Sequence, residues 1–171
     1  MVMKKDQLAS LLESKSFRQG VSFGIVSSAM TVLGMSLGMW SSDGRRKAIV
    51  AAIIGLAISN SFADGFSMYM GSYARGDSGK QALTTSLLTG ITELFLPFMF
   101  LIPLYLFKVR TAIILNGLFG VLLVAGTGLY VSEINKESDK EKMSSTVMYI
   151  AVTMAIMAAT YGTGLITKNL S

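Results

Sequence analysis

The 171-residue chain contains no cysteine and no histidine. Their absence excludes disulfide bonds, thiolate and imidazole metal ligands, and any cysteine or histidine nucleophile or base. A bound metal ion would therefore depend on oxygen ligands and on thioether sulfur, of which twelve methionines are a source. No motif places a nucleophile beside a base at a workable spacing, so we do not expect an enzyme.

Charged residues are scarce as well. They make up 15% of the chain, against 51% hydrophobic residues, and the mean hydropathy is +0.56. Long apolar blocks alternate with short charged clusters, which is typical of a multi-pass integral membrane protein. The net charge of +5 comes from basic residues that flank these blocks, where they would meet the headgroups of the lipid bilayer. We therefore expect a membrane protein that binds no nucleic acid.

The apolar blocks predict an all-α fold of five transmembrane helices joined by short loops. The expected spans are about 20–40, 48–74, 83–107, 111–131 and 146–166, which form one domain over residues 20–171. The charged stretch 133–145 is expected to be a solvated loop. Lysine and arginine number nine on the side of the N-terminus and six on the other, which favours a cytoplasmic N-terminus.

The N-terminal segment 1–19 is expected to be a separate element. Residues 3–18 predict an amphipathic helix, because Leu8, Leu11 and Leu12 share one face. This helix would lie at the membrane surface or form a solvated tail, and the sequence leaves both open. The segment lacks the pattern of a cleavable signal, because the first apolar block begins late and no small-residue cleavage site follows it.

Small residues form a stripe along the first span. They include two pairs spaced by four, Gly20 with Gly24 and Gly34 with Gly38, which allow another helix to approach closely. The stripe indicates either tight helix packing or the lining of a narrow permeation path.

The second span carries Asn60 and Asp64 near its middle. At about 100° per residue, both share an arc with Met68, opposite Phe62 and Phe66. A carboxylate at mid-membrane costs on the order of 2.5–3.5 kcal/mol on insertion scales, so we expect Asp64 to have either a polar partner or a functional role.

The third span contains a second intramembrane carboxylate, Glu93. Thr89, Glu93 and Pro97 are spaced by four and should share one face. Pro97 frees the backbone carbonyl of Glu93 from its helical hydrogen bond and kinks the helix. The pattern predicts either a cation-coordinating corner or a glutamate that is hydrogen-bonded to a neighbouring helix beside a packing kink.

Residues 55–74 read GLAISNSFADGFSMYMGSYA and resemble the second-helix signature of the vacuolar iron transporter family. Ser67, Met68, Gly71 and Tyr73 reproduce its spacing of Ser-Met, two residues, Gly, one residue, Tyr. The first span, the third span with Pro97, and the C-terminal AATYGTGLI are similar to the family's corresponding helices. The resemblance covers all five spans in their order.

The resemblance implies a five-helix fold that dimerises and exports Fe²⁺, and often Mn²⁺, from the cytosol in exchange for protons. The family's path methionine corresponds to Met68. Its first-helix aspartate corresponds to Ser27 and its second-helix glutamate to Asn60, so this chain carries neither carboxylate. The family's acidic helices between the second and third spans are replaced by the short segment RGDSGKQ.

Asp64 and Glu93 are the intramembrane carboxylates that could replace the missing ligands. The predicted metal-binding set is Asp64, Met68, Asn60, Glu93 and Ser27, whose donor types suit Fe²⁺ or Mn²⁺ as a transported substrate. No resident cofactor is expected. The alternative is a non-transporting membrane subunit that retains the transporter fold, in which Asp64 and Glu93 only satisfy buried polar partners. Carboxylates that lie together would favour transport, whereas side chains on different faces of the bundle would favour the alternative.

Overall fold

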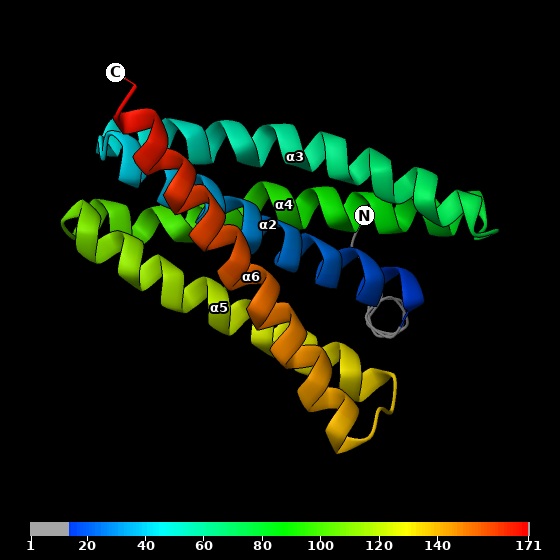
Figure 1. Ribbon diagram of the computed structural model, residues 1–171. Coiled ribbons are helices and arrows are strands. Elements are labelled where there is room, and N and C mark those ends of the chain that lie inside the picture. The colour runs from blue at the N-terminus through cyan, green and yellow to red at the C-terminus, as the bar shows by residue number, and fades with distance from the viewer. Residues whose placement is uncertain (1–13, 171) are drawn as a thin grey trace.

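The computed structural model describes residues 14–170, and within them it contains five helices and no strand. The helices are α2 (Lys15–Ser42), α3 (Arg46–Ala74), α4 (Gly79–Leu106), α5 (Val109–Ile134) and α6 (Asp139–Lys168) (Figure 1). Each is long and apolar enough to cross a membrane. The all-helical fold and the number of membrane-spanning helices are as predicted.

Two predicted boundaries differ from the structure. Helix α2 begins at Lys15 with Ser14 as its N-cap, so residues 15–19 continue the first span instead of belonging to a separate helix. The rest of the predicted amphipathic helix lies outside the described residues. The predicted loop 133–145 is also mostly helical, since α5 ends at Ile134 and α6 begins at Asp139.

A capping box explains why the charged stretch before the last span is helical. The Ser138 hydroxyl accepts a hydrogen bond from the backbone nitrogen of Glu141 (3.4 Å), and the Glu141 carboxylate accepts one from the backbone nitrogen of Ser138 (2.8 Å). These reciprocal bonds satisfy backbone groups that a helix end leaves unpaired. The charged residues therefore form the first turn of α6 rather than a loop.

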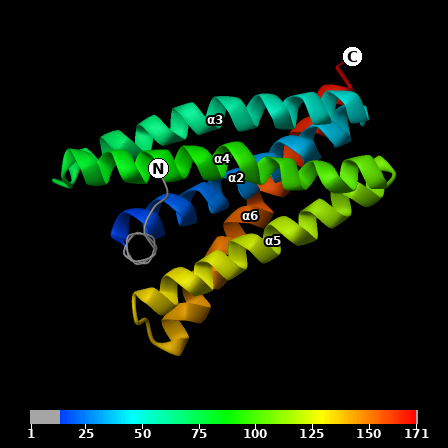
Figure 2. The same ribbon diagram turned by 180° about the vertical axis from the view of Figure 1, so that it is seen from behind.

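Helix α2 is central, because it contacts all four other described helices. Helices α3 and α4 lie side by side along their lengths, whereas α5 diverges from α4 beyond their shared turn (Figures 1 and 2). Helix α6 begins beside the end of α5 and then crosses α2 toward the C-terminus.

The small residues of α2 bring its neighbours unusually close. A Cβ atom at Gly20 would lie 2.6 Å from the carbonyl oxygen of Thr85 on α4. Near the other end of α2, a Cβ atom at Gly38 would lie 3.2 Å from the carbonyl oxygen of Thr160 on α6. A larger residue at Gly20 would force the helices to shift, and one at Gly38 would make a tight contact, so the stripe serves close helix packing.

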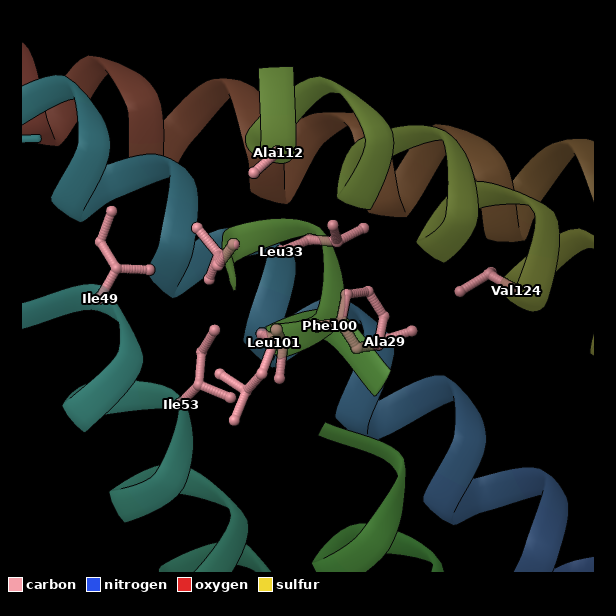
Figure 3. Close-up of a cluster of buried hydrophobic side chains, with 10 residues drawn as sticks. Ala29, Leu33, Ile49, Ile53, Phe100, Leu101, Ala112 and Val124 are labelled. Carbon is pink, nitrogen blue, oxygen red and sulfur yellow. The ribbon is translucent and has the colours of Figure 1, made fainter. Parts of the chain in front are cut away.

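The hydrophobic core lies where α2, α3, α4 and α5 converge. Buried side chains from these helices, among them Leu33, Ile53 and Phe100, pack together there (Figure 3). The outer surface carries large exposed apolar side chains such as Phe62 and Phe95. An apolar exterior around a small, partly polar interior is what a bilayer-embedded bundle requires.

Candidate functional site

Helices α2, α3 and α4 bring four of the predicted site residues together, with Glu93 buried and the other three half-buried. The hydroxyl of Ser27 on α2 donates a hydrogen bond to Oδ2 of Asp64 on α3, at 2.8 Å. The Glu93 carboxylate on α4 interacts electrostatically with Asp64 and has Ser27 and Asn60 as its other polar neighbours. We call Ser27, Asn60, Asp64 and Glu93 the acidic cluster. Its assembly from three helices is the arrangement that the sequence hypothesis required.

Glycines between α3 and α4 create the space for the acidic cluster. A Cβ atom at Gly90 would lie 2.8 Å from the carbonyl oxygen of Ser61, and one at Gly65 would lie 3.4 Å from that of Ser86. This close backbone approach lets short side chains reach across the helix interface. Gly90 and Gly65 therefore hold Glu93 and Asp64 within interaction distance.

The contact between α2 and α4 closes the other side of the acidic cluster. A Cβ atom at Gly24 would lie 2.7 Å from Cβ of Thr92. The hydroxyl of Thr89 donates a hydrogen bond to the carbonyl oxygen of Gly20, at 3.2 Å. The first half of α2 is thus seated on α4 one turn away from Ser27, which fixes the position of the Ser27 hydroxyl.

Glu93 is fully buried, with 0% of its surface exposed. Neither of its carboxylate oxygens has a hydrogen-bond partner of normal geometry. The ion pairs between described residues lie at the helix ends, and none includes Asp64 or Glu93. A buried carboxylate without such partners is costly, so the pair of carboxylates calls for a cation, either a proton or a metal ion.

The residues of α4 that were predicted to share one face do so, and that face is buried. Thr89, Glu93 and Pro97 are all buried, and the helix continues through Pro97 and Pro103 to Leu106. The packing interpretation of Glu93 requires a hydrogen bond to a neighbouring helix, and no such bond of normal geometry is formed. Ser27, Asn60 and Asp64 on the neighbouring helices are nevertheless its polar neighbours, so both interpretations of Glu93 remain predictions.

Two further residues, Met68 and Thr31, lie next to the acidic cluster. Met68 is half-buried on α3, one turn beyond Asp64, and is the predicted ligand that takes no part in the hydrogen bonds and electrostatic interactions of the other four residues. The hydroxyl of Thr31 accepts a hydrogen bond from Nδ2 of Asn60 (3.4 Å) and donates one to the carbonyl oxygen of Ser27 (2.8 Å). Thr31 is absent from the predicted set, although its position four residues after Ser27 on the small-residue stripe was a signal.

The donor atoms limit what the acidic cluster can bind. Two carboxylates, one amide and hydroxyl oxygens form an oxygen-rich set that suits a divalent cation. No group of three acidic, histidine or cysteine side chains comes together within residues 14–170. A metal ion here would be balanced by two carboxylates alone, which matches the charge of one divalent ion.

No protein-family model, curated protein or solved structure matches the chain. The resemblance to the vacuolar iron transporter family, and the homodimer that it implies, therefore remain predictions. The functional proposal depends on the geometry of the acidic cluster.

Proposed function

We propose that this protein is a membrane transporter of divalent metal ions of the Fe²⁺ and Mn²⁺ class, which exports the ion from the cytosol in exchange for protons. The observation that carries the proposal is the buried Glu93 carboxylate, which lies beside Asp64 and has neither a hydrogen bond of normal geometry nor an ion pair among the described residues. Intramembrane carboxylates that face a bundle interior commonly mark an ion pathway.

Each residue of the acidic cluster has a role in this proposal. Asp64 and Glu93 balance the two positive charges of the ion, and Asn60 and Ser27 offer neutral oxygen atoms. Met68 offers a softer thioether ligand one turn along α3, as the ion enters or leaves. When the ion departs, two neighbouring carboxylates in a low-dielectric interior repel each other. A proton that binds to the pair of carboxylates relieves this repulsion. Release of the metal ion is thereby coupled to uptake of a proton.

Uptake of Mn²⁺ into proteoliposomes tests the proposal. We expect Glu93→Gln and Asp64→Asn each to reduce uptake at least about tenfold, the lower bound of losses seen when even supporting groups of a metal site are removed. Glu133→Gln is the matched control, because Glu133 is an exposed carboxylate at the end of α5. Normal uptake by both cluster variants would contradict the proposal.

A non-transporting membrane subunit is the second candidate. The hydrogen bond from Ser27 to Asp64 favours it, because this bond gives one carboxylate a structural partner without a metal ion. The two candidates differ in whether the wild-type protein binds Mn²⁺ or Co²⁺. Calorimetry on the purified protein should show binding that Glu93→Gln removes, and wild-type protein that binds neither ion would favour the subunit.

A further inference from the structure

A groove separates the first half of α2 from the second half of α5. The two helices meet closely further along, where a Cβ atom at Gly120 would lie 2.5 Å from Cδ1 of Leu33. From there α5 diverges toward its end at Ile134 (Figure 2). The space left between them, closed on one side by Tyr149 of α6, is a cavity of about 610 Å³. This volume lies within the range of roughly 300–1,000 Å³ that is typical of ligand sites.

The lining of this groove changes from basic and polar to apolar. Its polar lining includes Lys15, Arg18, Gln19 and Asn135, and its apolar wall includes Phe23, Val26, Val131, Ile134 and Tyr149. Among residues 14–170, no acidic side chain lines this groove. A cationic entrance joined to an apolar wall is complementary to a molecule with an anionic head and a hydrocarbon tail.

A second groove adjoins the first along the same pair of helices. It has a volume of about 360 Å³, and its lining is largely apolar, with Phe17, Val21, Ile25 and Leu122 among its residues. Arg18, Ser22 and Thr127 line both grooves. Two apolar channels therefore meet beside one guanidinium, which matches a molecule with two hydrocarbon chains on one charged head.

Lys15 can add to the charge of Arg18. Its ammonium lies 3.2 Å from Oδ1 of Asp77, and its side chain remains 70% exposed. An ammonium has three donors, so this ion pair leaves donors for a second anion. The groove also opens at the end of the bundle where the chain places more of its lysine and arginine residues.

We propose that the two grooves between α2 and α5 bind one anionic phospholipid. Its phosphate is held by Arg18 and Lys15, and its acyl chains follow the apolar walls. Basic pockets between membrane helices are known to hold anionic headgroups. The apolar walls commit the site to a lipid rather than to a free phosphate ion. The grooves are not lined by any residue of the acidic cluster, so the lipid site does not depend on metal transport.

Native mass spectrometry of the protein in detergent, with phosphatidylglycerol and phosphatidylcholine of equal chain length, tests this site. We expect the wild type to retain phosphatidylglycerol selectively and Arg18→Gln to lower that retention about fivefold, the effect of one basic residue at an anionic membrane surface. Arg18→Lys, which keeps the charge, should preserve it. Arg110→Gln, an exposed arginine at the opposite end of the bundle, is the matched control and should retain the lipid.

Val131→Trp fills the groove while leaving both basic residues in place, and it should also release the lipid. Circular dichroism melting of each variant shows whether the fold is kept. If Val131→Trp fails to fold, Val131→Phe is the groove-filling variant to use in its place. Equal losses in Arg18→Gln and Arg110→Gln would overturn the proposal. It would likewise be overturned by full retention in a folded groove-filled variant, or by inorganic phosphate displacing the lipid at millimolar concentration.

Discussion

The two halves of α2 use small residues in the same way but reach different results. The first half packs through Gly20 and Gly24 against α4, next to the acidic cluster. The second half packs through Gly34 and Gly38 against α6, next to the hydrophobic core that includes Leu33. Glycine provides only the close approach. The neighbouring side chains decide whether the contact borders a polar site or the hydrophobic core. We call the contact of α2 with α4 the first joint and the contact of α2 with α6 the second joint.

The second joint carries more of the fold than the first. In the most hydrophobic window of each helix, 44% of residues are buried in α2 but only 11% in α6. Helix α6 therefore has little buried surface, and it is held by its contacts with α2 and α5. Helix α4 contacts α2, α3 and α5, so its seat on α2 is supported from elsewhere.

The largest effect is expected from Gly164→Val, at the crossing of α6 and α2. The added Cβ atom would overlap the carbonyl oxygen of Gly38 and the hydroxyl of Ser41. We expect a loss of about 3 kcal/mol in the free energy of unfolding, at the upper end of overpacking costs, measured by denaturant titration in detergent micelles. Gly162→Val is the control, because a Cβ atom there meets nothing within 4 Å. Equal losses of unfolding free energy in the two variants would show that close packing at the crossing does not contribute to stability.

Gly24→Val perturbs the first joint. Its Cβ atom would lie 2.7 Å from Cβ of Thr92, so α2 and α4 must move apart. We expect a cost of about 1–2 kcal/mol, smaller than at the α6 crossing because α4 keeps its other neighbours. The same shift should weaken Mn²⁺ binding in calorimetry, since Ser27 lies one turn away. Gly126→Val, where a Cβ atom meets nothing within 4 Å, should change neither quantity.

Glu93→Gln separates stability from function at the first joint. It removes a buried carboxylate that has no hydrogen bond of normal geometry, while it preserves the side-chain shape. We expect the metal-free protein to gain about 1 kcal/mol of stability, because a buried charge without a partner destabilises the folded state and the variant removes that charge. Thermal unfolding in detergent measures this gain. A lower melting temperature for Glu93→Gln, with Glu133→Gln unchanged, would mean that Glu93 serves the fold.

Ser41→Ala should give the smallest effect, at the second joint. Its hydroxyl donates a hydrogen bond to the carbonyl oxygen of Tyr161 on α6, at 2.9 Å. We expect a loss of about 0.6 kcal/mol, the average for a polar contact between membrane helices. Ser42→Ala is the matched control, since the Ser42 hydroxyl bonds to Met39 within α2 and should contribute nothing between helices. Unfolding by denaturant distinguishes the two variants.

The sequence by itself determined the features that depend on local pattern. The lengths of the apolar blocks predicted five membrane-spanning helices, and the helical period placed Thr89, Glu93 and Pro97 on one buried face. The small-residue spacing of α2 predicted close packing. These features follow from hydropathy and periodicity, which are properties of neighbouring residues in the chain.

Only the tertiary structure decided which faces meet. No periodic pattern pairs Ser27 with Asp64, places Glu93 beside them, or adds Thr31 to the site. These contacts arise because glycines on three helices allow the backbones to approach within reach of short side chains. The divergence of α5 from α2 that opens the lipid groove is likewise a property of packing. The sequences of the two helices do not predict the distance between them.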